Sequence, residues 1–212
     1  TIELIAKKFK YARYTPILYY KGEISQPEIL AQHNMGKFMK ILLIKRLESS
    51  FHAFRCSLGR FINSYESFIA EVDKGNVYVS KKYTNKIFEL LADDDGDAVE
   101  NLISKGKAEK LPSKNFKAEF KKDLQSDLDI LKEINQMWTG VNRDPKLLAF
   151  IDKLSTNPTL KKSKLIIFTE SRETAEYLAG KLREEVEGKT LLFTGGSLTS
   201  VREDVISNFD AK

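Results

Sequence analysis

Cysteine and histidine are nearly absent from this sequence, which has one cysteine and two histidines among 212 residues. The lone Cys56 excludes an internal disulfide and fits a reducing compartment. No apolar run approaches the roughly 18 residues that a membrane-spanning helix needs. The first residues, TIELIAKKFK, lack the basic, apolar and small-residue blocks of a signal peptide. We therefore expect a cytoplasmic protein with no membrane partner.

The sequence lacks the residues that metal binding and nucleophilic catalysis usually need. His52 and Cys56 stand four residues apart on a predicted helix, but no acidic partners at a set spacing complete a zinc site. The DDDGD sequence at 93–97 alternates like a calcium loop, yet its glycine is one residue out of step and no glutamate closes the set. With so few histidines, nucleophilic catalysis is not expected. The sequence therefore predicts no metal site and no catalytic residue.

A phosphate-binding loop is also missing. Gly188, Lys189 and Thr190 resemble the end of such a loop, but Arg183 stands where the motif needs a glycine. The order of elements is reversed as well, because here a predicted helix leads into a strand. We therefore expect this chain to bind neither ATP nor magnesium by itself.

The composition that remains is that of an ordinary globular protein, with 42% apolar and 31% charged residues. Its formal net charge of +5 permits an anionic partner such as nucleic acid without requiring one. Charge alone therefore does not identify a partner.

Two apolar stripes with helical spacing dominate the middle of the chain. The first contains Ile44, Leu47, Phe51, Phe54, Leu58, Phe61, Tyr65, Phe68 and Val72, and the second Phe116, Phe120, Leu124, Leu128, Leu131, Ile134 and Trp138. Steps of three and four residues place each set on one face of a helix. A single helix from Met35 to Val72 would be on the order of 50 Å long and would need a partner to cover it. We therefore predict a long antiparallel helical hairpin.

The pattern changes after residue 140. A predicted helix (Pro145–Leu154) is followed by the apolar run Lys164–Thr169, a helix (Glu173–Glu187), a second strand (Thr190–Phe193) and a helix (Val201–Phe209). This alternation is typical of a parallel sheet covered by helices. Near the start of the chain, residues 12–20 have the aromatic and β-branched composition of a strand, with Pro16 favouring a sheet edge. The predicted fold class is α/β with a large helical insertion.

The two strand-to-helix turns of the last region are the candidate binding site. In a parallel sheet both turns would lie at the carboxyl edge, where helix N-termini favour anions. The candidate nucleic-acid-binding residues are Thr169, Ser171, Arg172, Thr194, Gly195, Ser197 and Arg202. The alternative is that Ser171 and Thr199 are only helix N-caps and that Glu173 and Arg202 are ordinary helix residues.

Several segments resemble one family. MGKFMKILLIKRLESSFHAFRCSLGRF (35–61) is similar to the inter-lobe helix of bacterial Swi/Snf-type ATPases, the group that includes the RNA-polymerase-associated ATPase. DPKLLAFIDKL (144–154) resembles the helix that opens their second lobe, and KLIIFTESRETAEYL (164–178) resembles helicase motif IV. LLFTGGSLTSVREDVISNF (191–209) resembles the following block, and ARYTPILYY (12–20) the closing segment of the first lobe.

The resemblance implies an ATP-dependent translocase on DNA or RNA, with two RecA-like lobes and a partial parallel sheet in this chain. It divides the chain into the end of the first lobe (1–34), a helical inter-lobe region (35–140) and the start of the second lobe (141–212). The parent protein would use ATP and magnesium, bind nucleic acid, most simply double-stranded DNA, and act on a protein complex such as RNA polymerase.

The chain departs from the family in lacking a Walker A sequence, an Asp-Glu-x-His box and the arginine-rich final motif. We therefore expect a fragment without ATPase activity of its own. Two readings from other classes remain open. One is a helical protein-interaction module that binds a partner through its aromatic stripe, and the other is a small α/β binding domain unrelated to helicases.

Overall fold

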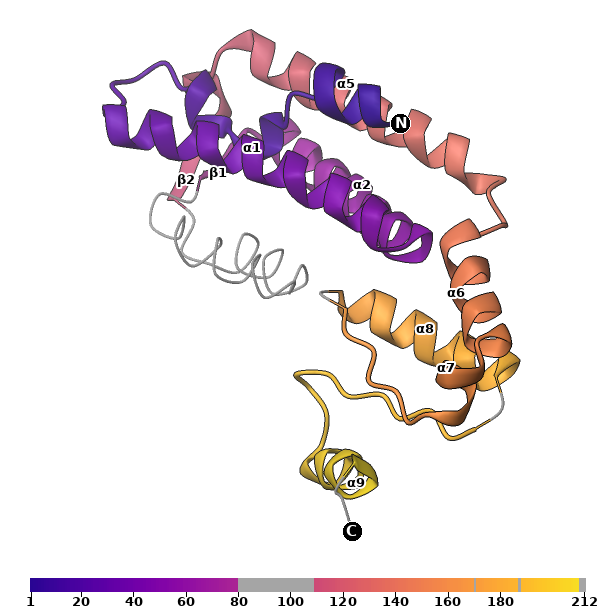
Figure 1. Cartoon of the computed structure of the whole chain (residues 1–212). Helices are drawn as coiled ribbons and strands as arrows, with labels where there is room; N and C mark the ends of the chain where they lie inside the picture. The colour runs from indigo at the N-terminus through magenta and orange to yellow at the C-terminus, as the bar shows by residue number, and fades with distance from the viewer. Residues whose placement is uncertain (80–108, 170, 187, 210–212) are drawn as a thin grey trace.

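The computed structural model describes residues 1–79, 109–169, 171–186 and 188–209. Most of these residues are helical (Figure 1). In chain order the elements are the short turns η1 (Leu4–Lys8), η2 (Ala12–Tyr14) and η3 (Pro16–Tyr19), the helices α1 (Gln26–Ser49) and α2 (Phe51–Asp73), the strands β1 (Asn76–Val79) and β2 (Glu109–Pro112), the turn η4 (Ser113–Asn115), and the helices α5 (Ala118–Thr139), α6 (Pro145–Thr156), α7 (Pro158–Lys162), α8 (Arg172–Glu185) and α9 (Thr199–Phe209).

The predicted α/β class is wrong. Among the described residues the only sheet is the antiparallel pair β1–β2, so the protein is mainly helical and has no parallel RecA-like sheet there. The segments 164–169 and 190–193, which were expected to be strands, have no regular secondary structure. A β-strand exists only where a neighbour pairs with its backbone, and the apolar composition that suggested these strands does not supply that neighbour.

Residues 12–20 also differ from the predicted strand, because they form the short turns η2 and η3. Pro16 opens η3, where its fixed φ suits a helical turn and its missing N–H would weaken a strand. Tyr20 keeps one antiparallel β-bridge, to Phe116. The N-terminal segment therefore lies against the helices as a series of turns.

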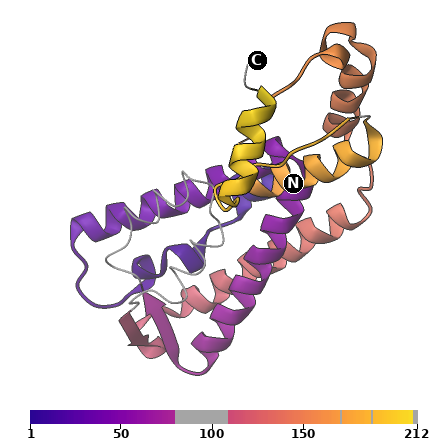
Figure 2. The ribbon, with the colours of Figure 1, turned by 90° about the horizontal axis from the view of Figure 1, so that it is seen from below.

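The predicted single helix from Met35 to Val72 is two helices. Ser50 interrupts it with extended backbone (φ −158°, ψ 154°), and its hydroxyl accepts a hydrogen bond from the N–H of Ala53 at 3.0 Å. Serine is a favoured N-cap because its side chain satisfies a free N–H of the first turn. Figure 2 shows α1 and α2 diverging from their common end. We call Ser49 and Ser50 the α1–α2 junction.

The predicted packing of the two stripes is found between α2 and α5, although Ile44 and Leu47 of the first stripe lie on α1 and Phe116 of the second precedes α5. Phe54 meets Trp138 with ring centroids 4.9 Å apart, and Phe68 meets Phe120 at 6.1 Å. These pairs run in opposite directions along the two helices, so α2 and α5 are antiparallel. The strands β1 and β2 close the far end of this pair, with Asn76 opposite Pro112. Together with α1, these helices form one hydrophobic core, which we call the helical unit.

A buried carboxylate fastens the N-terminal segment to the helical unit. Asp127 on α5 is fully buried and accepts backbone hydrogen bonds from Lys10 at 2.6 Å and Ala12 at 2.8 Å. The hydroxyl of Tyr65 on α2 donates a third bond at 3.0 Å. Tyr11 lies between the two amides with a φ of +59°, a left-handed conformation in which both N–H groups face one acceptor. Three elements of the fold therefore meet at one side chain.

The helices α6 to α9 lie beyond the end of the helical unit at which α1 and α2 meet (Figures 1 and 2). The predicted bounds of α6 and α8 differ from the observed ones by no more than two residues, and Ala179 and Leu182 of α8 are buried. Each helix in the described ranges is too short or too polar to cross a lipid bilayer.

Candidate functional site

Ser171 lies at the point where α8 meets α1. Its hydroxyl oxygen caps α8 by accepting a hydrogen bond from the N–H of Thr174 at 3.3 Å, so the N-cap alternative is confirmed for this residue. The same oxygen accepts a 2.7 Å hydrogen bond from Nη1 of Arg46, on α1. Both side chains are buried, with Ser171 and Arg46 each 2% exposed. Ser171 therefore contacts the helical unit rather than solvent.

Two arginines from different helices hold one carboxylate beside Ser171. Glu173, in the first turn of α8, accepts from Arg46 of α1 at 3.0 Å and from Arg60 of α2 at 2.6 Å. Burial opposes ionisation of Glu173, but attraction by Arg46 and Arg60 outweighs it and leaves the pKa of the carboxyl below its ordinary value. Glu173 is therefore an anion that links α8 to both helices.

Hydroxyl groups complete this contact at the α1–α2 junction. The hydroxyl oxygens of Ser49 and Ser50 lie 2.8 and 3.1 Å from that of Thr174. Lys146 of α6 donates to the backbone carbonyl of Ser49 at 3.1 Å and to that of Glu48 at 2.7 Å, at the end of α1 where carbonyls lack helical partners. We use the name junction cluster for the seven side chains that meet here: Arg46, Ser49, Ser50, Arg60, Ser171, Glu173 and Thr174.

The other candidates of the first turn are exposed. The hydroxyl oxygen of Thr169 accepts a hydrogen bond from the N–H of Ser171 at 3.2 Å, and Thr169 is exposed to solvent. Arg172 pairs with Glu176 one turn along α8, at 2.9 Å. Both residues are exposed and therefore accessible to a ligand.

The second turn has its own hydrogen bonds. The N–H of Thr194 donates to the Ser197 hydroxyl at 2.8 Å, and the N–H of Ser197 donates to the Thr194 carbonyl at 3.0 Å. Gly195, at the tip, has open space where a Cβ would lie. Arg202 is exposed in the first turn of α9, which begins at Thr199. Thr194, Gly195 and Ser197 thus form one tight turn with a basic residue shortly after it.

The structure does not unite the two turns as predicted. The prediction placed them at one edge of a parallel sheet, and that sheet is absent from the described residues. Ser171 instead contacts Arg46, and Glu173 beside it contacts both Arg46 and Arg60. The sequence argument selected neither arginine. A signal existed, because Arg46 continues the buried face of Met35, Met39 and Leu43, and a charge in such a series indicates a buried partner.

Other places in the structure offer little chemistry. His52 stacks on Tyr177 with ring centroids 4.7 Å apart, and the Cys56 sulfur lies 3.5 Å from His52 Nε2. Burial raises the pKa of the Cys56 thiol, which makes it a weak nucleophile. Within the described ranges there is no group of three potential metal-ligating side chains. The sequence 93–97, considered above as a calcium loop, lies outside these ranges.

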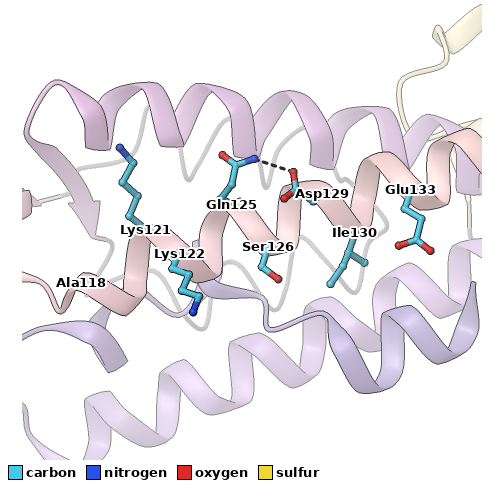
Figure 3. Close-up of a pocket in the computed structure, with 8 residues that line it drawn as sticks. All are labelled: Ala118, Lys121, Lys122, Gln125, Ser126, Asp129, Ile130 and Glu133. Atoms are coloured by element: carbon cyan, nitrogen blue, oxygen red, sulfur yellow. Dashed lines mark hydrogen bonds between the residues drawn. The ribbon is translucent and has the colours of Figure 1, made fainter.

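An open hollow of about 690 Å³ runs along the outer face of α5 (Figure 3). Its lining residues are Ala118, Lys121, Lys122, Gln125, Ser126, Asp129, Ile130 and Glu133. All of them belong to α5, and two lysines and two carboxylates balance one another. Gln125 donates a hydrogen bond to Asp129 at 2.9 Å. Side chains from a single helix face cannot surround a small ligand, so we do not assign the hollow a function.

Comparisons with protein-family models, with curated proteins and with solved structures found no significant match to this chain.

Proposed function

We propose that the chain is part of an ATP-driven nucleic-acid translocase of the Swi/Snf type, in which the helical unit is a rigid support for α8. One observation supports this proposal above the others. The segment resembling the inter-lobe helix (35–61) and the segment resembling motif IV (164–178) contact each other through Arg46, Ser171 and Glu173. Two segments assigned to one motor by resemblance therefore share a buried polar contact.

The junction cluster suits the transmission of force. Arg46 and Arg60 hold Glu173 from two helices, so α8 cannot rotate or slide without breaking a largely buried ion pair. Separating buried opposite charges is costly because each would be left without a partner in a poorly polar environment. A movement of the helical unit is therefore passed to α8 and to the turns that flank it.

In this proposal the chain supplies contacts to nucleic acid, and other parts of the protein bind ATP and magnesium. Thr169, Arg172 and the turn of Thr194, Gly195 and Ser197 are accessible to backbone phosphates, and Arg202 adds a positive charge. Such contacts are independent of sequence and suit movement along double-stranded DNA. A complex such as RNA polymerase would be the object that is moved, in the cytoplasm.

The decisive experiment measures ATP hydrolysis by the full-length protein that contains this chain, with and without double-stranded DNA. We expect DNA to stimulate hydrolysis. Glu173→Gln should reduce the number of base pairs translocated per ATP, because the support then slips relative to α8. Glu176→Gln, on the exposed side of the same helix, is the matched control and should leave this ratio unchanged. Hydrolysis that is absent, or indifferent to DNA, would refute the proposal.

The second candidate is a helical protein-interaction module without motor function. The aromatic stripe first considered as its docking surface is internal, since Phe54 and Tyr65 are fully buried. The observation that favours a module is the exposure of Leu30 and Ile41 on α1, which a partner helix could cover. Binding of a partner protein that is abolished by Ile41→Lys, in a protein without DNA-stimulated hydrolysis, would favour this function.

A further inference from the structure

The apolar core of the helical unit stops at the end of α5. Within the described residues it begins at Leu4, and Trp138 is the last residue along the chain that packs against it. The helices α6 and α8 bury four apolar residues of their own, which do not belong to that core: Leu147, Leu154, Ala179 and Leu182. Among the described residues, the helical unit and the helices α6 and α8 therefore have separate apolar interiors.

Polar and charged groups connect these two parts. The junction cluster supplies ion pairs and hydroxyl contacts, and Lys146 of α6 donates to two backbone carbonyls of α1. His52 of α2 stacks on Tyr177 of α8, and both of these rings carry polar atoms. Water can hydrate such groups once the two parts separate, whereas an apolar core gains no comparable interaction from water. This contact can therefore open at a smaller cost in free energy than the helical unit can unfold.

The backbone between the two parts permits such a separation. Residues 141–144, which connect α5 to α6, have no regular secondary structure. Hinges in proteins are typically a few loop residues of this kind, next to the end of a helix. Because α6 and α8 contact each other, rotation about 141–144 would carry them together and leave both helices intact.

We propose that the junction cluster is a releasable docking contact: α6 and α8 separate together from α1 and α2 while the helical unit stays folded. The chain then has two states, the docked one that the structure shows and a released one. This inference does not depend on the motor function proposed above.

Release changes what the N-terminus of α8 presents to a ligand. In the docked state Ser171 is 2% exposed, and its hydroxyl is bonded to Arg46. The other six candidates for nucleic-acid binding are exposed or partly exposed, so Ser171 is the one that docking buries. Separation from α1 uncovers the Ser171 hydroxyl and the carboxylate of Glu173. The docking contact thereby controls which groups of α8 are accessible.

Native-state hydrogen exchange of the chain tests the release, because each backbone N–H exchanges through the least costly opening that exposes it. Relative to their intrinsic rates, the amides of Ala179 and Leu182 in α8 should exchange at least about 10-fold faster than those of Leu128 and Leu131 in α5. Equal protection of the two sets would overturn the proposal, because α8 would then open only together with the helical unit.

Two variants test whether the ion pairs hold the docked state. Glu173→Gln should accelerate exchange in α8 on the order of 100-fold, because the docked state then buries Arg46 without its counter-charge, and should leave exchange in α5 unchanged. Arg60→Gln removes the second cation, should act in the same direction, and replaces Glu173→Gln if that variant does not fold.

Glu176→Gln is the matched control, since it makes the same change at an exposed ion pair of α8 and should alter exchange by no more than about two-fold. Exchange in α8 that neither Glu173→Gln nor Arg60→Gln accelerates beyond this control would overturn the proposal.

Spin labels distinguish separation of α8 from unravelling in place. The labels are attached through Ile41→Cys on α1 and Glu185→Cys at the end of α8, two exposed positions, and Cys56→Ser removes the native thiol. Pulsed electron paramagnetic resonance should give one narrow distance for the otherwise wild-type chain. Adding Glu173→Gln should produce a second population with longer and broader distances. A labelled Glu173→Gln chain that keeps only the wild-type distance would overturn the proposal.

Discussion

Nη1 of Arg46 lies 2.7 Å from the hydroxyl oxygen of Ser171, a residue 125 positions further along the chain. The same guanidinium is 3.0 Å from Glu173; the contact with Ser171 is buried and the contact with Glu173 is partly buried. This contact connects the helical unit to α8, and it makes the stability of the whole chain sensitive to one carboxylate.

Glu173→Gln should lower the free energy of unfolding by about 3 kcal/mol, the lower end for breaking a buried ion pair, because Glu173 is partly accessible. The substitution keeps the shape of the side chain and leaves Arg46 buried without its counter-charge. Urea unfolding followed by circular dichroism measures the effect. Glu176→Gln removes an exposed i,i+4 pair with Arg172 and should cost no more than about 0.5 kcal/mol. Equal decreases in the free energy of unfolding of the two variants would show that the junction cluster stabilises the protein no more than an exposed ion pair does.

Phe54→Ala should cost about 3–5 kcal/mol, because the ring is fully buried and its removal leaves a cavity beside Trp138. Thermal unfolding should show a clearly lower midpoint. Leu30→Ala removes an exposed side chain of α1 and should change stability by about 0.5 kcal/mol or less. An unchanged midpoint in Phe54→Ala would mean that α2 and α5 do not pack in solution as they do in the structure.

Asp127 should make the protein less stable as pH rises from about 4 to 7. Burial raises its pKa to about 6, and this effect outweighs the hydrogen bonds from Lys10, Ala12 and Tyr65 that favour the charged form. In the unfolded chain the group ionises near pH 3.9, so between those values the unfolded state releases its proton first and is stabilised relative to the folded state. The free energy of unfolding should fall by on the order of 3 kcal/mol over this range.

Asp127→Asn removes this titration while keeping one carbonyl acceptor. The stability of the variant relative to the wild type should therefore rise between pH 4 and pH 7, measured as urea midpoints at several pH values. Subtracting the two curves cancels other titrating groups such as Glu173, whose lowered pKa acts in the opposite direction. A difference that does not change with pH would place the pKa of Asp127 near its ordinary value.

Arg172 should contribute one cationic contact to nucleic-acid binding by the full-length protein. Each neutralised phosphate adds about 0.7 to 0.9 to the logarithmic salt slope, so Arg172→Ala should lower the slope by about that amount. Thr169→Ala should weaken binding but leave the slope nearly unchanged, because a neutral hydroxyl displaces no counterion. Titrations of labelled DNA at several salt concentrations measure both. If wild type and Arg172→Ala have equal slopes, Arg172 does not contact the phosphates.

Local sequence determined the helices and the faces that they bury. Ser25 and Glu28 form a capping box that starts α1, and the three-and-four spacing of the stripes specifies which sides of α2 and α5 meet. Ser50 carried a signal for the helix break, because serine is a favoured N-cap. The apolar stripe continues through this position with helical spacing, however, and the sequence alone does not show whether the helix ends there or continues. Apart from the break at Ser50, neighbouring residues decide these features, so they can be predicted from sequence.

Tertiary structure decided the sheet and the site. Lys164–Thr169 and Thr190–Phe193 have the composition of strands, yet strand formation requires a paired neighbour, and composition contains no information about one. Arg46, Ser171 and Asp127 acquire their roles from partners more than a hundred positions away, brought together when α8 and the N-terminal segment pack on the helical unit. Contacts over such sequence distances depend on how whole elements dock, and periodicity along the chain reports only which face of each element is apolar.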